Sequence, residues 1–158
     1  LKMKRAIFPG SFDPFTIGHA DIVKRGLQLF DNIIIAVGYN TQKKSWIPTA
    51  ERVSAIKEFY KDEPRISVEE YSGLTTDFAK EKEAGFILRS IRSVKDYEYE
   101  LNIADINRQL SGIETVLLLA NPEMASISSS VVRELAGFGH DIQSFIPQGF
   151  RYNNIEQQ

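Results

Sequence analysis

The chain alternates five times between a short apolar run and an amphipathic helical pattern. This alternation predicts strands at residues 4–9, 33–37, 65–70, 86–88 and 115–119, and helices at 19–30, 50–60, 76–83, 94–110 and 129–136. The run Ile-Ile-Ile-Ala-Val at 33–37 is typical of a strand that is covered on both faces. We therefore expect an α/β fold: a single doubly wound domain over 1–158 with a five-stranded parallel sheet and a polar tail from about residue 152.

The composition narrows the chemistry that such a domain can perform. The 158 residues include no cysteine, which excludes disulfides and thiolate catalysis and fits a cytoplasmic location. The two histidines are too few for a His-rich metal centre. The net charge of −2 does not indicate a nucleic-acid partner, and neither a signal peptide nor a membrane span is expected.

The stretch from residue 8 to 19 connects the first predicted strand to the first helix. Pro9, Gly10, Pro14 and Gly18 fix turns in it, and His19 falls where the helix begins. Free N–H groups and the helix dipole favour anions at such a position. A histidine in an ordinary strand-to-helix loop would look the same, so this stretch alone leaves both interpretations open.

Polar side chains follow each predicted strand at its carboxyl end. In order along the chain they are Ser11, Thr16, His19, Asn40, Lys43, Lys44, Thr75, Arg89, Arg92, Asn121 and Ser128–Ser130. Each has an ordinary alternative, such as a solvated lysine, an arginine beside an acidic helix start or an N-cap serine; we interpret His140 as structural. Because parallel strands end at one edge of a sheet, their shared position predicts a site for a small molecule with several phosphates.

Familiar nucleotide and hydrolase motifs are missing. The sequence has no G-x-x-x-x-G-K-[ST], no G-x-G-x-x-G after the first strand and no G-x-S-x-G. The predicted edge cluster contains donors and cations but no evident carboxylate base. Such a set stabilises developing negative charge, and it suits phosphoryl or nucleotidyl transfer with an already anionic nucleophile.

The longest predicted helix carries two apolar stripes. Tyr97, Leu101 and Ala104 form one, and a second is formed by Tyr99, Ile103, Ile106 and Leu110. We expect one stripe to pack on the sheet. The other is explained equally by burial within the fold or by contact with another subunit.

Two short sequences carry a family resemblance. Thr16-Ile17-Gly18-His19 and the run Ile-Ser-Ser-Ser-Val-Val-Arg at 127–133 resemble the two signatures of the nucleotidylyltransferase superfamily, whose fold is Rossmann-like. The run P-G-S-F-D-P-F-T-I-G-H at 9–19, Lys43-Lys44, the R-S-I-R at 89–92, the D-Y-E-Y-E at 96–100 and Asn107-Arg108 are similar to bacterial phosphopantetheine adenylyltransferases.

The resemblance implies transfer of the adenylyl group of ATP to 4′-phosphopantetheine with Mg²⁺, in a homo-oligomer that is commonly a hexamer. It implies His19, Lys43 and Arg92 as catalytic residues and Ser11, Lys43, Thr75 and Arg89 as acceptor contacts. The ATP contacts that it implies are Ser11, Phe12, His19, Ser90, Ile91, Arg92, Glu100, Met124, Ala125, Ser126, Ile127, Ser128, Ser129 and Ser130. It assigns no metal ligand.

Other functions remain open at this point. Another phosphate acceptor, such as nicotinamide mononucleotide or glycerol 3-phosphate, is an alternative, and so is a nucleotide-binding regulatory module that has lost catalysis. Four residues depart from the family pattern: Ser11 replaces a frequent threonine, Ser90 a glycine, Met124 a tryptophan and Thr75 an apolar residue.

Overall fold

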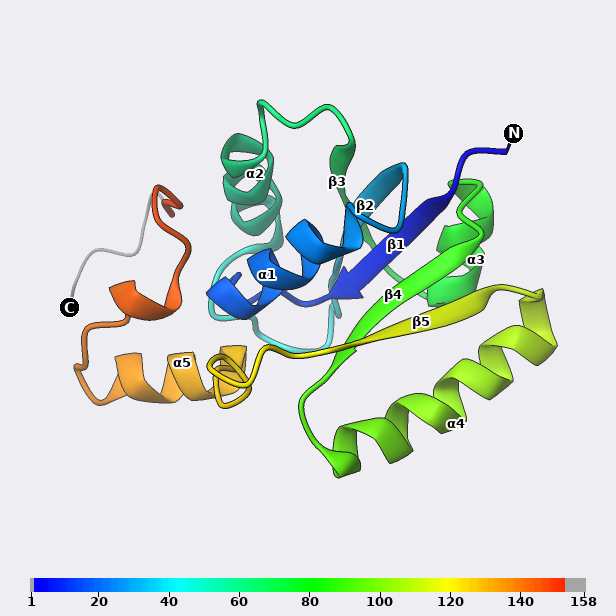
Figure 1. Ribbon diagram of the computed structural model, residues 1–158. Coiled ribbons are helices and arrows are strands. Elements are labelled where there is room, and N and C mark those ends of the chain that lie inside the picture. The colour runs from blue at the N-terminus through cyan, green and yellow to red at the C-terminus, as the bar shows by residue number, and fades with distance from the viewer. Residues whose placement is uncertain (1, 153–158) are drawn as a thin grey trace.

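The computed structural model describes residues 2–152 and confirms the α/β class. Its strands, all parallel, are β1 (Arg5–Gly10), β2 (Asn32–Gly38), β3 (Ile66–Tyr71), β4 (Phe86–Ile91) and β5 (Glu114–Leu119), in the order β3-β2-β1-β4-β5. The helices are α1 (Ile17–Gly26), α2 (Thr49–Phe59), α3 (Thr75–Glu81), α4 (Val94–Ser111) and α5 (Ser129–Gly137), followed by the short 3₁₀ helix η1 (Gln143–Phe145) (Figure 1).

Helices cover both faces of the sheet. Since alternate side chains of each strand point to opposite faces, the sheet contributes to two clusters of buried residues. Along β2, Ile33 and Ile35 pack in one cluster with α1 and α2, whereas Ile34 and Ala36 pack in another with α3. Right-handed crossovers place α4 on the α3 side, where it runs along β5 (Figure 1). The continuous apolar run at 33–37 is therefore explained by burial on both faces.

The chain reverses direction across the sheet between β1 and β4. It moves outward from β1 to β3 and then returns, through α3, to place β4 on the other side of β1. At such a switch point the loops that leave neighbouring strands diverge and open a crevice. The loop after β1 and the end of β4 therefore meet where a ligand can bind.

Several predicted boundaries were wrong, and α1, β4 and α2 are examples. The first helix ends at Gly26, four residues earlier than predicted, because the chain turns over 27–29 before Phe30 enters the core. Strand β4 continues to Ile91, so Arg89 and Ser90 lie inside the strand, where they pair with β5. Thr49 is the first residue of α2, and its hydroxyl accepts a hydrogen bond from Arg52 at 2.8 Å.

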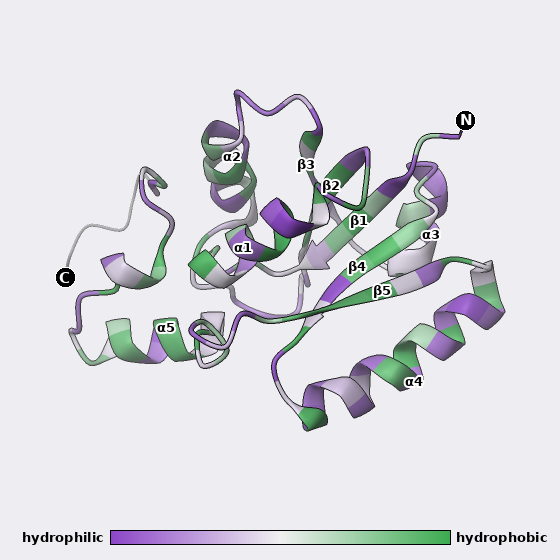
Figure 2. Cartoon of the chain, in the orientation of Figure 1, coloured by the Kyte–Doolittle hydropathy of each residue, from purple (hydrophilic) through white to green (hydrophobic). Residues whose placement is uncertain are grey.

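The prediction that an apolar stripe of α4 packs on the sheet was wrong. Tyr97 and Leu101 of the first stripe are exposed, as are all members of the second. The least exposed positions of α4 recur at helical spacing and are mainly polar: Asp96, Glu100, Ala104, Asn107 and Ser111. Figure 2 shows green, hydrophobic residues along α4, between purple, hydrophilic ones.

Two further results concern helix length and the C-terminal segment. Within residues 2–152, no helix combines the length and apolar character that crossing a membrane requires. Tyr152, which we expected to open a polar tail, packs against Phe150, and its hydroxyl accepts a hydrogen bond from the Phe15 N–H at 2.9 Å. The remainder of the predicted tail lies outside the described residues.

Candidate active site

A cleft of about 390 Å³ lies at the switch point between β1 and β4. It is lined by the loop after β1, the start of α1, the end of β4, the first turns of α4 and the start of α5. Twelve of the site residues that the resemblance implies line it: Ser11, Phe12, His19, Arg89, Ser90, Arg92, Glu100, Met124, Ile127, Ser128, Ser129 and Ser130. The structure thus brings together residues that are more than 100 positions apart in the sequence.

Five of the site residues that the resemblance implies do not line this cleft: Lys43, Thr75, Ile91, Ala125 and Ser126. Lys43 is exposed in the loop between β2 and α2. Thr75 starts α3, and its hydroxyl lies 3.0 Å from that of Tyr71. The loops that carry these two residues follow β2 and β3, which lie on the far side of β1 from β4. Their substrate contacts stay predictions.

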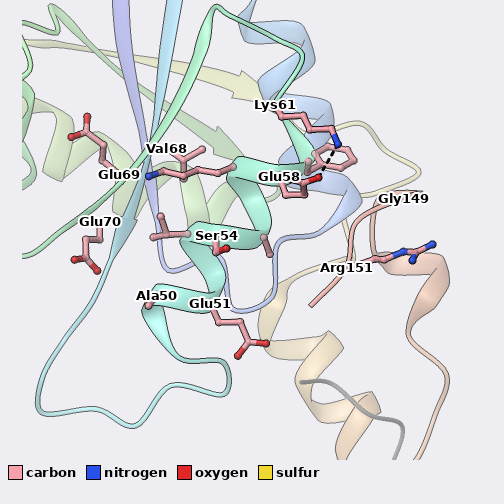
Figure 3. Close-up of a pocket in the computed structure, with 14 residues that line it drawn as sticks. Ala50, Glu51, Ser54, Glu58, Lys61, Val68, Glu69, Glu70, Gly149 and Arg151 are labelled. Carbon is pink, nitrogen blue, oxygen red and sulfur yellow. Dashed lines mark hydrogen bonds and ion pairs between the residues drawn. The ribbon is translucent and has the colours of Figure 1, made fainter. Parts of the chain in front are cut away.

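A larger, open hollow of about 1320 Å³ lies between α2, β3 and residues 149–151 (Figure 3). Acidic side chains are prominent around it, including Glu58, which pairs with Lys61 at 2.8 Å, and Glu69 and Glu70 (Figure 3). Carboxylates repel phosphates, and the lining of this hollow holds four of them, Glu51, Glu58, Glu69 and Glu70, beside the three basic residues Lys57, Lys61 and Arg151. We therefore place the candidate site in the smaller cleft.

The imidazole of His19 is held neutral in a fixed tautomer. Burial, together with the nearby charges of Arg92 and Arg89, lowers the pKa of His19 from 6.5 to about 3. Its Nδ1 accepts a hydrogen bond from the Thr16 N–H at 3.0 Å, and the Thr16 hydroxyl accepts one from the His19 N–H at 3.4 Å. A neutral imidazole carries one ring hydrogen, which must therefore lie on Nε2. His19 thus presents an N–H donor to the cleft, and it is neither a base nor a cation.

Aromatic rings enclose the other sides of His19. The Phe12 ring centroid lies 4.9 Å from that of His19, and those of Phe15 and Phe8 lie 5.4 and 6.3 Å away. Phe12 is 2% exposed and has φ of 49°, a left-handed conformation that is rare for a bulky residue. The Phe12 ring packs edge-on against the imidazole, with the two ring planes at 81°, and so supports the histidine.

Gly10 leaves room for this aromatic packing. A Cβ at Gly10 would lie 3.0 Å from the Cζ of Phe12, closer than carbon atoms normally pack. The glycine at the end of β1 therefore has a steric reason: it allows the Phe12 ring to approach the backbone.

Five backbone groups of residues 11–16 are hydrogen-bonded to side chains from other segments of the chain. The carbonyls of Ser11, Asp13 and Pro14 accept hydrogen bonds from Arg52, Arg133 (2.6 Å) and Ser129 (2.8 Å) respectively. The N–H groups of Phe15 and Thr16 donate to Tyr152 and to His19. Because its partners come from α1, α2, α5 and the C-terminal segment, this loop is fixed before any ligand binds.

Two arginines enter the cleft from β4 and the turn after it. The Arg89 guanidinium donates to the Glu100 carboxylate through Nη2 at 2.6 Å and through Nε at 3.0 Å, and its Nη1 donates to the Pro9 carbonyl at 2.8 Å. The Glu100 side chain is 7% exposed. The Arg92 Nε lies 3.5 Å from the Asp96 carboxylate. The nearest partner of Glu100, the predicted ATP contact, is therefore Arg89.

The three serines before α5 have different partners. Ser128 is the N-cap, and its hydroxyl accepts the Val131 N–H at 3.2 Å. The Ser129 hydroxyl donates to Pro14, and the Ser130 hydroxyl accepts a hydrogen bond from Arg133 at 3.3 Å. The helix start faces the cleft with free backbone N–H groups, the arrangement that binds phosphates in many proteins.

Carboxylates in the cleft are already paired with cations. Asp21 pairs with Arg25 at 3.1 Å, Asp96 with Arg92 and Glu100 with Arg89. Among residues 2–152, no cluster of three or more His, Cys, Asp or Glu side chains could hold a metal ion. The donor set of this cleft therefore suits an anionic ligand and does not fit a metal ion held by protein carboxylates.

Asp13 and Arg52 are functional residues that the sequence did not predict. Both are buried and bind backbone groups of the loops around the cleft. Arg52 stands in an ordinary helical sequence, Ala-Glu-Arg-Val, that gives no sign of burial. Asp13 lies within the run at 9–19 that carries the resemblance, but nothing in the sequence indicates its partners.

Comparison with known proteins places this fold and cleft among nucleotidyl-transferring enzymes. Residues 7–135 match the model of the cytidylyltransferase-like family. The chain is 56% identical over 149 residues to the phosphopantetheine adenylyltransferase of Phocaeicola vulgatus, a match that covers 94% of this chain and 99% of that protein. It is 56% identical over 147 residues to the enzyme of that name from Bacteroides fragilis, covering 93% and 98%. The chain belongs to the phosphopantetheine adenylyltransferase family.

A solved structure supports the same fold at much lower sequence identity. A bifunctional NMN adenylyltransferase/ADP ribose pyrophosphatase from Francisella tularensis superposes with a TM-score of 0.69 at 16% identity. The match covers 92% of this chain and 45% of that protein. It supports the nucleotidyltransferase-like fold alone.

Proposed function

We propose that this chain transfers the adenylyl group of ATP to 4′-phosphopantetheine, giving dephospho-coenzyme A and pyrophosphate. The acceptor and the product follow from family membership; the cleft supports the chemistry. The observation that carries the proposal is the neutral His19, whose Nδ1 is occupied by the Thr16 N–H so that Nε2 must be the donor. Such a group can donate a hydrogen bond to a phosphate oxygen without becoming protonated itself.

The reaction requires little covalent chemistry from the protein. A phosphate oxygen of the acceptor attacks the α-phosphorus of ATP, a new P–O bond forms, and the bond to the β-phosphate bridging oxygen breaks in line with it. The nucleophile is already ionised near pH 7, because the second pKa of a phosphate ester is about 6. Catalysis then depends on orientation and on stabilising the charge that builds on the α-phosphate oxygens.

The position of each residue in the cleft indicates which phosphate it binds. The His19 Nε2–H and the loop after β1 face the α-phosphate as its negative charge grows. Arg92 and the free N–H groups at the start of α5 bind the β- and γ-phosphates. Arg89 receives the acceptor phosphate, and Lys43 approaches it from the exposed loop after β2. Thr75 contacts the acceptor from the start of α3.

Mg²⁺ belongs to the substrate in this proposal. The paired carboxylates of the cleft offer no metal site of their own. Mg²⁺ is commonly bound through substrate phosphates while it retains several waters. We therefore infer that the ion enters as Mg·ATP.

A pyrophosphate-release assay with a panel of acceptors tests the function directly. With Mg·ATP, we expect turnover with 4′-phosphopantetheine and at least about 10³-fold lower kcat/KM with nicotinamide mononucleotide or glycerol 3-phosphate. Absence of turnover with 4′-phosphopantetheine would refute the proposal. Comparable turnover with nicotinamide mononucleotide would favour the second acceptor.

Assembly and location complete the proposal. The apolar side of α4 is exposed in a single chain, which supports a homo-oligomer, a hexamer by resemblance. We place the enzyme in the cytoplasm, where ATP is made and used. Neither nucleic acid nor a membrane is proposed as a partner.

A further inference from the structure

Two buried ionic side chains bind the same peptide segment at a distance from the reacting groups. Asp13 in the loop after β1 is 7% exposed, and Arg52 in α2 is 2% exposed. The Asp13 carboxylate accepts the N–H groups of Trp46 and Ile47, both at 2.8 Å. The Nε of Arg52 donates to the Ile47 carbonyl at 2.9 Å. Ile47 is therefore held on its N–H by a carboxylate and on its C=O by a guanidinium.

Arg52 joins this segment to two others. Its Nη1 donates to the carbonyl of Ser11 in the loop after β1 and lies 3.5 Å from the carbonyl of Gly38 at the end of β2. Its Nη2 donates to the Thr49 hydroxyl at 2.8 Å. A planar guanidinium can serve several acceptors in fixed directions, which a lysine ammonium on a flexible stem cannot do. The buried arginine therefore fixes these segments in one position relative to each other.

The segment that this network holds is the base of a long loop. Residues 39–48 leave β2, make a wide excursion and return to α2, which begins at Thr49 (Figure 3). Lys43 lies in this excursion, is exposed and makes a local hydrogen bond, from its N–H to the Asn40 carbonyl at 3.1 Å. The direction in which Lys43 is presented therefore depends on how the ends of the loop are fixed.

We propose that Asp13 and Arg52 form a latch that fixes residues 39–48 to the loop after β1 and thereby positions Lys43 for the acceptor phosphate. Both are positioning residues, because they bind backbone groups of the two loops. This inference rests on the proposed function, since it assigns Lys43 to the acceptor. The latch itself can be tested without that assignment.

The single tryptophan of the chain reports on the latch directly. Trp46 precedes Ile47, its own N–H is bound by Asp13, and its side chain is partly exposed. Quenching of its fluorescence by acrylamide in the full-length, unliganded protein measures how freely this segment moves. Asp13→Asn replaces one acceptor oxygen with an N–H donor. Arg52→Lys keeps the positive charge but loses the planar guanidinium that serves several acceptors.

We expect the acrylamide quenching constant of Trp46 to rise about twofold in both variants, because the loop base loses bonds that order it. Thr49→Val, which removes one acceptor of Arg52, should give a smaller rise while leaving the fold intact. The matched controls Asp62→Asn and Arg65→Lys change exposed side chains of the same types and should leave the quenching unchanged.

Kinetics then separate positioning from a general structural role. In the latch variants the KM for 4′-phosphopantetheine should rise about tenfold while the KM for ATP stays within about twofold. In a Lys43→Ala background the same variants should add less than about twofold to the acceptor KM, because residues that act through one group are not additive.

Each outcome decides one of the two claims. Unchanged quenching in Asp13→Asn and Arg52→Lys would overturn the latch; if either variant fails to fold, unchanged quenching in Thr49→Val would do so. If quenching increases but the latch variants raise the acceptor KM by the same factor with and without Lys43→Ala, the positioning of Lys43 by the latch is overturned. An unchanged acceptor KM in Lys43→Ala alone would contradict the proposed role of Lys43, while the quenching result would still stand for the latch.

Discussion

His19 shows how three neighbouring interactions define the chemistry of one side chain. The Thr16 N–H occupies Nδ1, the rings of Phe12 and Phe15 pack against the imidazole, and the two arginines disfavour a positive charge. A neutral donor of this kind interacts most strongly with an α-phosphate when its charge is greatest. The residue should therefore contribute to the transition state more than to ground-state binding.

This distribution predicts the kinetics of His19→Ala. We expect kcat to fall at least about 10²-fold while the KM for ATP changes less than about threefold. His140→Ala is the matched control, because the second histidine is exposed in the turn after α5 and should leave kcat unchanged. A large rise in the ATP KM without a loss of kcat would instead assign His19 to substrate binding.

The lowered pKa of His19 also predicts how stability depends on pH. In the unfolded chain the imidazole takes up a proton below pH 6.5, whereas in the folded chain it does so only near pH 3. The unfolded state thus binds more protons between these values, so stability is full above pH 6.5 and is lost as the pH falls toward 3. Urea unfolding at pH 6.5 and 5.0 should show a loss of up to about 1.4 kcal/mol per pH unit.

His19→Asn provides the comparison for this pH effect, because it removes the titrating group while keeping a polar side chain. Its loss of unfolding free energy between pH 6.5 and 5.0 should be smaller than that of the parent chain. Equal losses in the two proteins would show that His19 titrates normally in the folded state.

At the scale of elements, the contact between β4 and α4 organises one side of the cleft. Glu100 leaves the second turn of α4 and meets Arg89 of β4 with both carboxylate oxygens, at 3.0 and 3.1 Å from Nε. The pair compensates the charge of Glu100, which would otherwise be costly to bury. The helix therefore sets the direction in which the strand presents its arginine.

Glu100→Gln distinguishes this role from a direct ATP contact. The amide would oppose one N–H of Arg89 with another donor and loosen the guanidinium. We expect the KM for 4′-phosphopantetheine to rise about 5- to 10-fold, corresponding to one weakened charge-assisted hydrogen bond, with little change in the KM for ATP. A selective rise in the ATP KM, measured in the same pyrophosphate assay, would support the contact that the resemblance implies.

The packing of α1 on the sheet gives a prediction of stability. A Cβ at Gly26 would lie 2.8 Å from Leu88 Cδ2 and 2.9 Å from Ile33 Cδ1, and both residues are fully buried. Gly26→Ala should therefore lower the unfolding free energy by about 1–3 kcal/mol, as overpacked cores do, and lower the Tm. Gly137→Ala is the control, because a Cβ there meets no atom within 4 Å. Equal melting temperatures for the two variants would contradict this packing.

The sequence predicted the elements better than their ends and their partners. The order of strands and helices and the edge that holds the cleft followed from hydrophobic periodicity, because burial on both faces of a parallel sheet leaves a clear pattern. The end of β4 was missed because Arg89 and Ser90 are polar residues inside a strand. Arg52 could not be found, because its acceptors are backbone carbonyls, which leave no trace in residue types.

At the scale of the whole molecule, the two sides of the sheet differ. The side covered by α1 and α2 has a continuous buried core, whereas apolar side chains remain exposed around α4 and the end of β5. There α4 turns a mainly polar stripe toward β4 and β5 and leaves its apolar residues outward. Leu119 at the end of β5 is exposed as well. Large exposed apolar surfaces of soluble proteins usually mark contacts with other chains.

The assembled state should therefore depend on the apolar side of α4. Ile106 and Leu110 are 55% and 66% exposed in the single chain, and a carboxylate buried among such side chains in an interface would lose its hydration. We expect sedimentation velocity to show an oligomer for the unmodified chain and a monomer for Ile106→Glu, with the same far-UV circular dichroism. Leu29→Glu, which places the same charge at an exposed apolar residue after α1, should leave the oligomer intact. A monomeric unmodified chain at all concentrations would instead mean that this helix tolerates water along its apolar side, and both substitutions would then leave sedimentation unchanged.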